Sequence, residues 1–483
     1  MTLAAFGKTL RRAALPGALA VAIAGCMVGP DYVRPEAPTP ATFKEGVGWK
    51  TAEPRDGMAR GHWWEVFGDA DLDALELQVD ISNQTVQAAE AQVREARAAT
   101  QAVRAGLFPS VNANATALRS SRNSSNGSST SSSATTSYNA ALDASWEVDL
   151  WGRVRRGVEA SETGAQASEA DLAAARLSAQ SQLAQSYLLL RVQDAQIELL
   201  KDTVVAYDRA LQLTKNQYAA GIVARGDVAQ AEAQLKSTQA QVLEARIARA
   251  QLEHAIAVLV GKPPAQLAIA PRELKALFPA IPLAVPSELL ERRPDIAAAE
   301  RRVASANAQI GVAEAAFYPS LSLSAVGGVQ SSALGDLISL PSRYWSVGAS
   351  LAQFLFDGGL RSAQKAQAIA AYDATVAGYR STVLDAFQEV EDNLVALSLL
   401  EQEAVVQDDA VKFARESATI ATNQYKAGTV SYVVVVVLQA AALNSERTSL
   451  GILGRRLTAS VGLIKALGGG WDASALAAAP SKD

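Results

Sequence analysis

The sequence predicts an α+β membrane protein whose chain contains two tandem copies of one structural unit. Three observations support this prediction: a repeated hexapeptide, four short segments in which apolar and polar residues alternate, and two long alanine-rich segments without proline. The hexapeptide is NQYAAG at 216–221 and NQYKAG at 423–428, and QAAEAQV at 87–93 aligns in the same way with AAAERRV at 297–303. Two matches at nearly the same offset indicate an internal tandem repeat.

The first 25 residues have the pattern of a secretory signal peptide. Lys8, Arg11 and Arg12 precede an apolar stretch at 13–22 that is too short to cross a bilayer as a helix. The chain's formal net charge of −5 becomes more negative when this basic segment is removed. Nucleic-acid binding needs a basic face, so no nucleic-acid partner is expected.

The signal peptide ends in IAGC at 23–26, which resembles the lipobox of bacterial lipoproteins. We therefore expect cleavage before Cys26 and a covalent lipid (N-acyl and S-diacylglycerol groups) on this residue, with no other cofactor. An ordinary buried cysteine is the alternative. Cys26 is the only cysteine, which excludes an intramolecular disulfide. Met27 follows it in place of the aspartate that tends to retain such lipoproteins at the inner membrane, which favours the outer membrane.

Period-two alternation predicts four β-strands, each with one apolar and one polar face. Two strands lie within about 110–150 and two within about 320–356, each about ten residues long, the length that spans a bilayer when tilted. A soluble β-sandwich is the alternative. The Ser-, Thr-, Asn- and Gly-rich stretch 120–137 predicts a solvated loop between the first two strands, and about 328–343 closes the second pair.

The alanine-rich segments predict very long helices. A helix from about Arg153 to Tyr218 would be roughly 100 Å long at 1.5 Å per residue. An ordinary coiled coil is the alternative, but its seams usually carry leucine or isoleucine. Alanine at the seams lets helices approach closely and form a curved wall. Past the leader, no segment has about 18 uncharged apolar residues in a row, so no transmembrane helix is predicted.

These signals divide the chain into six parts. The leader covers 1–25, and a lipidated, extended N-terminal segment covers 26–70. The two repeats cover 71–262, with a tip turn at about 216–227, and 294–467, with a tip turn at about 423–434. A proline-rich crossover linker (263–293) joins the repeats, and a tail (468–483) ends the chain.

Four lipid-facing strands cannot close into a barrel. Their edges would leave backbone groups unpaired in hydrocarbon, at a cost of several kcal/mol each. Bacterial barrels have an even number of strands, from eight upward. Two copies of the chain would supply eight strands and three copies twelve, and the residues alone do not choose between a dimer and a trimer.

Nearly the whole chain resembles the TolC-like outer membrane efflux channels, in particular their NodT-type lipoprotein branch. GPDYVRP at 29–35 is similar to the start of those mature proteins, and WWEVFGDADL at 63–72 is similar to their next element. The most specific stretch begins RRPDIAAAE at 292–300 and continues through ANAQIG at 306–311 to FYP at 317–319.

The resemblance implies a trimer with a 12-stranded outer membrane β-barrel, continued by a long periplasmic α-helical barrel with a mixed equatorial region. It implies passive conduction of small molecules by a lipid-anchored outer membrane protein that extends into the periplasm. The implied partners are two further copies of the chain, outer membrane lipid, a periplasmic adaptor (membrane fusion) protein and a resistance-nodulation-division inner-membrane pump. Type I protein secretion and metal efflux are alternative roles, and a trimeric structural surface lipoprotein is the alternative outside the channel class.

The resemblance also assigns the repeated hexapeptides to the periplasmic tip, where each long helix turns back. Gly221 and Gly428 suit a helix C-terminus with positive φ, and each hexapeptide also carries a tyrosine, Tyr218 or Tyr425. Asp227 and Tyr425 match family positions that hold the entrance shut, so we expect a hydrogen bond between them in the closed state. The plainer interpretation is that both hexapeptides are only turns.

A valine run at 433–437 departs from the family pattern. Val434 and Val437 stand where related channels often carry aspartates that ring the pore. A hydrophobic constriction that gates by dewetting is one interpretation, and valines that only pack between helices are the other.

Catalysis is not expected. Metal sites and Ser-His or Cys-His nucleophiles need convergent histidines or thiols. The chain has two histidines, His62 and His254, and its cysteine is assigned to lipid.

Overall fold

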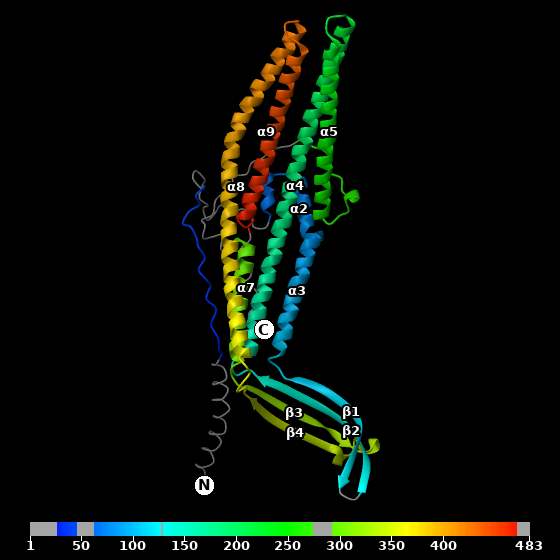
Figure 1. Cartoon of the computed structure of the whole chain (residues 1–483), viewed down its shortest axis with the longest axis vertical. Coiled ribbons are helices and arrows are strands. Elements are labelled where there is room, and N and C mark those ends of the chain that lie inside the picture. The colour runs from blue at the N-terminus through cyan, green and yellow to red at the C-terminus, as the bar shows by residue number, and fades with distance from the viewer. Residues whose placement is uncertain (1–26, 46–61, 127–128, 274–291, 471–483) are drawn as a thin grey trace. The chain divides into compact units, whose positions relative to one another are not determined.

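A computed structural model describes residues 27–45, 62–126, 129–273 and 292–470, without side-chain detail at 122–133. The predicted leader and Cys26 lie outside the described residues. The chain divides into two compact units (Figure 1). The first contains Met1–Glu36, Val93–Ser168 and Ala299–Tyr379, and the second contains Ala37–Gln92, Glu169–Ala298 and Arg380–Asp483.

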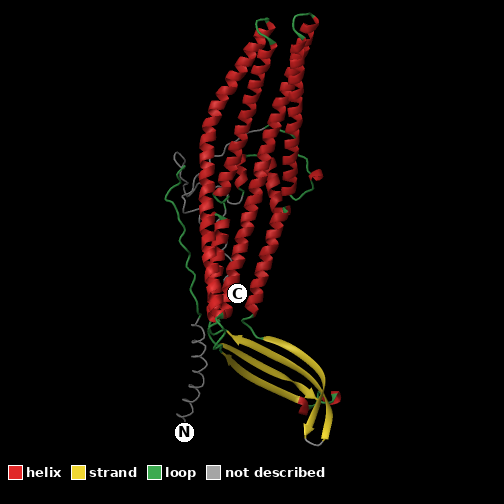
Figure 2. Cartoon of the chain, in the orientation of Figure 1, coloured by secondary structure: helices red, strands yellow, loops and turns green. Residues whose placement is uncertain are grey.

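Helices account for the regular structure described in the second unit, whereas the strands lie in the first (Figure 2). The helical elements in chain order are η1 (Trp63–Phe67), α2 (Ala70–Ser82), α3 (Gln84–Ala105), α4 (Arg153–Ala219), α5 (Arg225–Leu259), η2 (Pro264–Gln266), α7 (Pro294–Ala315), η3 (Leu334–Asp336), η4 (Leu340–Ser342), α8 (Leu360–Lys426) and α9 (Tyr432–Ala466). No described helix is long and apolar enough to cross a membrane.

Helices α4 and α8 are the corresponding long helices of the two repeats, and each has 67 residues. The predicted helix at about 153–218 is therefore confirmed, at roughly 100 Å. Both helices start in the same way. The Asp149 carboxylate accepts hydrogen bonds from the backbone N–H groups of Val154 and Arg155, at 3.0 and 2.9 Å. The Asp357 carboxylate accepts from Gly359 and Arg361, at 3.0 and 3.2 Å. A carboxylate at this position satisfies N–H groups that the first helical turn leaves unpaired.

The sheet contains four antiparallel strands in the order β1 (Ser110–Asn126), β2 (Ser129–Val148), β3 (Ser320–Ser331) and β4 (Arg343–Ala352). Its register places Ala113 opposite Leu142, Leu142 opposite Gly327, and Gly327 opposite Trp345. Apolar positions of all four strands therefore share one face, and Asn, Asp, Ser and Glu share the other. The predicted two-faced strands are confirmed, and strands β1 and β4 are the open edges.

The first hairpin differs from the prediction. The stretch 120–137 was expected to be a solvated loop, but β1 and β2 stay paired from Ser110–Ser145 out to Asn126–Ser129. The strands are 17 and 20 residues long rather than about ten. The reason is that an antiparallel ladder is held by backbone hydrogen bonds, which a polar sequence forms as well as an apolar one. The connection between β3 and β4 is a loop, as predicted, and it contains the short 3-10 turns η3 and η4.

Part of the proline-rich linker is fixed to the helices of the second unit. Arg191 donates to the Ala270 carbonyl at 2.8 Å, and Arg249 donates to the Ile269 carbonyl at 2.6 Å. Arg272 pairs with Asp69 at 2.6 Å. Residues 274–291 of the linker lie outside the described residues.

Candidate functional site

The two helical hairpins, α4–α5 and α8–α9, end in turns with the same backbone design (Figure 1). Ile222 N–H donates to the Gln217 carbonyl at 2.8 Å, and Thr429 N–H donates to the Gln424 carbonyl at 3.0 Å. Gly221 and Gly428 have φ of 71° and 75°. This is the Schellman arrangement, in which a residue at positive φ ends the helix and its neighbours satisfy the last carbonyls. The predicted helix-ending role of both glycines is confirmed.

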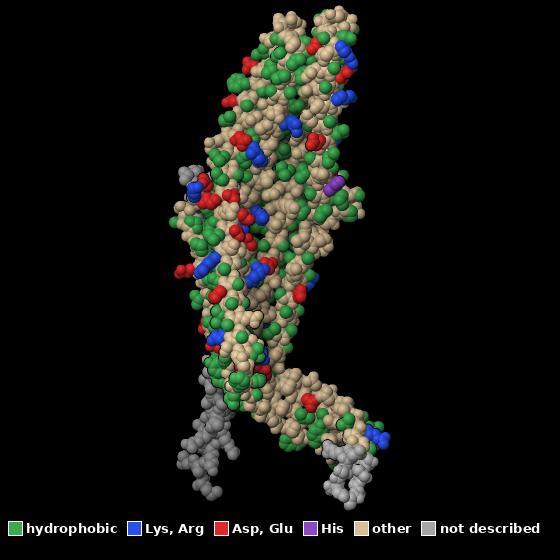
Figure 3. Space-filling view, in the orientation of Figure 1, with side chains coloured by type: hydrophobic (Ala, Val, Ile, Leu, Met, Phe, Trp, Pro, Cys, Tyr) green, Lys and Arg blue, Asp and Glu red, His purple; other side chains and the backbone are tan. Residues whose placement is uncertain are grey.

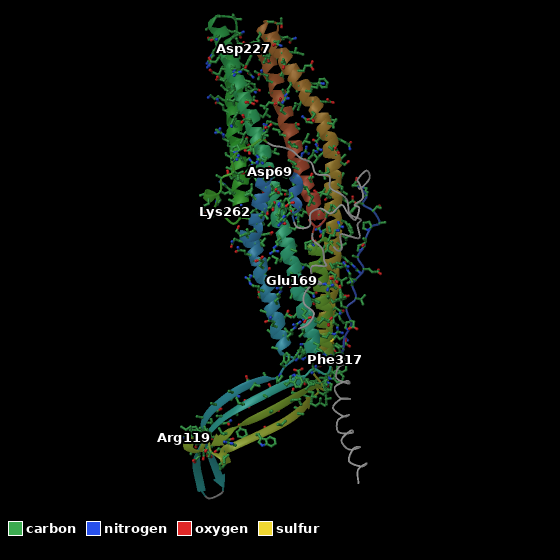
Figure 4. The ribbon with its side chains drawn as sticks, turned by 180° about the vertical axis from the view of Figure 1, so that it is seen from behind. Asp69, Arg119, Glu169, Asp227, Lys262 and Phe317 are labelled. Atoms are coloured by element: carbon green, nitrogen blue, oxygen red, sulfur yellow. The ribbon has the colours of Figure 1, made fainter. Side chains whose placement is uncertain are left out.

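Asp227 lies at the start of α5, close to the tip of its hairpin (Figure 4). Its carboxylate accepts a hydrogen bond from the backbone N–H of Ala224 at 3.2 Å. A carboxylate in the first turn also interacts favourably with the positive end of the helix dipole. Asp227 therefore stabilises the first turn of α5.

Below the turns, both hairpins share one apolar cluster. Tyr207 and Leu211 come from α4, and Tyr425 from α8 packs near Tyr432, Val435 and Val436 from α9; Val228, Ala231, Leu235 and Ala421 complete the cluster. The Tyr425 and Tyr432 rings are 5.2 Å apart at 57°. The hairpin tips are thus held together by side chains from all four helices.

A polar contact also joins the hairpins at this cluster. The Tyr425 hydroxyl donates to the side-chain oxygen of Gln217 at 2.6 Å. The expected Asp227–Tyr425 bond is not formed among the described residues of this chain. Within one chain, Gln217 accepts from the Tyr425 hydroxyl and the Asp227 carboxylate caps its own helix. An Asp227–Tyr425 bond between neighbouring copies stays a prediction. Gln217 was within the repeated motif, but nothing in the sequence identified it as the partner.

Two tyrosines of the cluster, Tyr432 and Tyr207, have raised pKa values. Burial, together with the proximity of Tyr425, Tyr207 and Asp227, raises the pKa of Tyr432 to about 12. Burial likewise raises the pKa of Tyr207. These phenols can therefore supply hydrogen bonds and apolar contact but no charge. Among the described residues, no group of three or more His, Cys, Asp or Glu could hold a metal ion.

The Tyr and Gln of the hexapeptide occur in both repeats but have different environments at the two tips. Tyr425 is 7% exposed, whereas Tyr218, its counterpart in the first hexapeptide, is 45% exposed. Gln424, the counterpart of Gln217, is also exposed. One Tyr–Gln pair is therefore formed within the chain, and the equivalent pair is left open on its surface.

The valine run divides into two groups. Val435 and Val436 are buried in the cluster, which accounts for them by packing alone. Val433, Val434 and Val437 are between 40% and 60% exposed. Packing within one chain therefore does not account for Val434 and Val437, the two positions singled out in the sequence, and their role in the pore stays a prediction.

Comparison with known proteins identifies the family. The model of the outer membrane efflux protein family matches the chain twice, at residues 78–262 and 285–469. The chain is 32% identical over 453 residues to the probable efflux pump outer membrane protein TtgC of Pseudomonas putida, covering 93% of each. It is 31% identical to the pyoverdine export outer membrane protein OpmQ of Pseudomonas aeruginosa, covering 90% of this chain and 94% of that one.

The solved structure of the Campylobacter jejuni CmeC outer membrane channel superimposes with a TM-score of 0.87 and 26% identity, over 93% of this chain and 96% of that one. The chain belongs to the outer membrane efflux protein family. The fold predicted for it, a trimeric β-barrel with a long α-helical barrel, and its outer membrane location are confirmed.

Proposed function

We propose that this chain is the channel of a tripartite efflux pump, and that three copies passively conduct small molecules from the periplasm to the exterior. The observation that carries this proposal is a four-stranded sheet with one apolar face and two unpaired edges, β1 and β4. In a bilayer such edges require further copies of the chain. The family to which the chain belongs is a family of outer membrane channels for efflux.

The proposed partners are a periplasmic adaptor protein and an energised inner-membrane pump of the resistance-nodulation-division class. The proposed anchor is the lipid on Cys26. One relative is named as a probable efflux pump component and another for pyoverdine export. Because similar channels carry such different names, we infer that the pump rather than the channel selects the cargo. Type I protein secretion and metal efflux remain the alternative roles.

We further propose that the hairpin tips form the closed entrance, held by a ring of Tyr–Gln hydrogen bonds. Within each chain, Tyr425 bonds Gln217. The repeat relates Tyr425 to Tyr218 and Gln217 to Gln424, and both counterparts are exposed. In a ring of three chains, hairpin α4–α5 of one copy lies beside hairpin α8–α9 of the next. Tyr218 then donates to Gln424 of the neighbouring copy, and the ring contains six bonds.

Single-channel conductance in planar bilayers tests the channel and this ring together. The wild-type trimer is expected to conduct weakly when closed. Tyr425→Phe combined with Tyr218→Phe removes every proposed hydroxyl. It is expected to raise the ratio of open to closed channels by at least about tenfold, since each lost hydrogen bond contributes about 1 kcal/mol and the ring loses several of them. Tyr372→Phe, the same chemical change elsewhere on α8, is the control.

The outcomes separate the two parts of the proposal. If wild type and variants never conduct, the chain is a structural surface lipoprotein rather than a channel. If the wild type conducts and the double variant behaves like Tyr372→Phe, the channel stands and the Tyr–Gln ring is wrong.

A further inference from the structure

The apolar face of the sheet carries charge at one end only. Among the side chains described on this face, the charged ones are Arg119 of β1 and Arg343 of β4. Arg119 follows Ala117 and Arg343 precedes Trp345 in the period-two alternation. The acidic side chains of the strands, Asp143 and Glu147, lie on the opposite, polar face. The apolar face, which is suited to lipid, therefore has a basic margin formed by Arg119 and Arg343, with no acidic side chain described beside it on the same face.

Both arginines lie where the four-stranded part of the sheet ends, away from its junction with the helices, and β1 and β2 continue past this point as a hairpin. Figure 4 shows Arg119 at this end and Phe317 at the other. Arg343 is the first residue of β4 and pairs with Val329, near the end of β3. Figure 3 shows basic side chains at the same end of the sheet.

Equal spacing along the chain relates this margin to bilayer thickness. Phe108, 70% exposed, lies just before β1 and precedes Arg119 by eleven residues, and Phe354, 67% exposed, lies just after β4 and follows Arg343 by eleven. The strand residues between them, 110–119 and 343–352, span about 30 Å at about 3.3 Å per residue, or about 21 Å across a membrane at the usual tilt of about 45°. The apolar band of outer membrane barrels is about 25 Å tall, with aromatic residues at its margins. With the phenylalanines at the inner interface, both arginines reach the outer head groups.

The structure gives these arginines no internal task. Both are exposed, and neither forms a hydrogen bond or ion pair among the described residues. Asp336 lies in the loop before β4 but forms no salt bridge with Arg343. Next to Arg343, the Trp345 ring is 79% exposed, and the same loop exposes Leu334, Ile338 and Leu340. Apolar side chains next to an unpaired guanidinium match the boundary between acyl chains and head groups, because long basic side chains extend toward the polar region.

We propose that Arg343 of one copy and Arg119 of the next form a binding site for the phosphate groups of an outer-leaflet glycolipid. The inference rests on the trimeric channel proposed above, in which β4 of each copy meets β1 of the next. Their equal distance from the phenylalanines places both arginines at one height, so each of the three seams presents two guanidinium groups. Guanidinium binds phosphate oxygens through paired, charge-assisted hydrogen bonds.

Native mass spectrometry of the detergent-extracted trimer tests this site with lipid A as the probe. Wild type is expected to retain about three phosphorylated lipid A molecules, one for each seam, and to bind dephosphorylated lipid A at least about tenfold more weakly. Arg119→Gln with Arg343→Gln is expected to show the same loss for phosphorylated lipid A. Arg119→Lys with Arg343→Lys is expected to retain most of the binding, since the charge remains.

Lys236→Gln with Lys412→Gln is the matched control, because it removes equal charge from exposed helix positions. The proposal is overturned if the arginine variant binds like this control, if both forms of lipid A bind equally, or if inorganic phosphate at millimolar concentration displaces the lipid. Trimer mass and conductance are recorded on the same samples. Normal trimers with unchanged lipid binding reject the lipid site alone, whereas a monomeric, non-conducting wild type rejects the proposed channel.

Discussion

Glu76 of α2 is fully buried, although glutamate is ordinarily ionised and exposed to solvent. Burial is the main cause that raises its pKa to about 9, and the nearby Asp80 carboxylate adds to the effect. The side chain is therefore protonated at neutral pH in the folded chain, but ionised in the unfolded chain above its ordinary pKa of about 4.3. Because the folded state then binds one more proton, the free energy of unfolding falls as the pH rises between these two values.

Replacement of Glu76 by glutamine, which has the same shape but no charge, removes this pH dependence of the free energy of unfolding. Glu76→Gln is expected to leave stability nearly unchanged at pH 4 and to increase it at pH 9 by more than about 3 kcal/mol, since each unit of difference between the folded and unfolded pKa contributes about 1.4 kcal/mol. Thermal unfolding at both pH values measures the difference. Glu198→Gln, at an exposed site on α4, is the control. Equal shifts for the two variants at pH 9 would contradict the assignment of a neutral, buried Glu76.

The first turns of α9 place two consecutive valines in opposite environments. Val436 is 5% exposed within the tip cluster, and Val437 is 60% exposed. If Val437 contributes to an apolar constriction, a charge there changes conduction without affecting the fold. A charge at Val436 instead enters the cluster and is costly.

Two aspartate variants test this division. Val437→Asp is expected to keep the wild-type unfolding temperature and to raise conductance and cation preference in planar bilayers, since it hydrates the constriction. Val436→Asp is expected to lose about 3 kcal/mol or more of stability. If Val437→Asp conducts like wild type, the exposed valines do not form the constriction.

The elements that the sequence predicted correctly are those with a periodic side-chain pattern. The alternation around Leu142 and Leu323 gave the sheet faces, and the proline-free, alanine-rich segment after Arg153 gave α4. The paired strands beyond Ser120 could not be predicted this way, because backbone hydrogen bonds leave no mark on a polar sequence.

The candidate site was predictable only in part. Gly221 and Gly428 were identified from local chain geometry, which a short motif encodes. The Tyr425–Gln217 bond and the different exposure of Tyr218 depend on which helix packs against each repeat. The tyrosine and glutamine are the same in both hexapeptides, so the motif carries no information about this difference.

At the scale of the whole molecule, the account depends on closure of the sheet by other copies. The described part of the chain has four strands with free edges at β1 and β4, and one face suited to lipid. Unpaired edges cannot persist in hydrocarbon. Three copies give twelve strands and space for a lumen, and they also bring together the two arginines of the proposed lipid site and the halves of the Tyr–Gln ring.

The mass of the mature protein extracted in detergent, with bound detergent subtracted, tests this claim most directly. The account predicts the mass of three chains, in a complex that stays intact on dilution. A stable single chain would leave four strands with open edges and would contradict the shared barrel, the entrance ring and the seam site together.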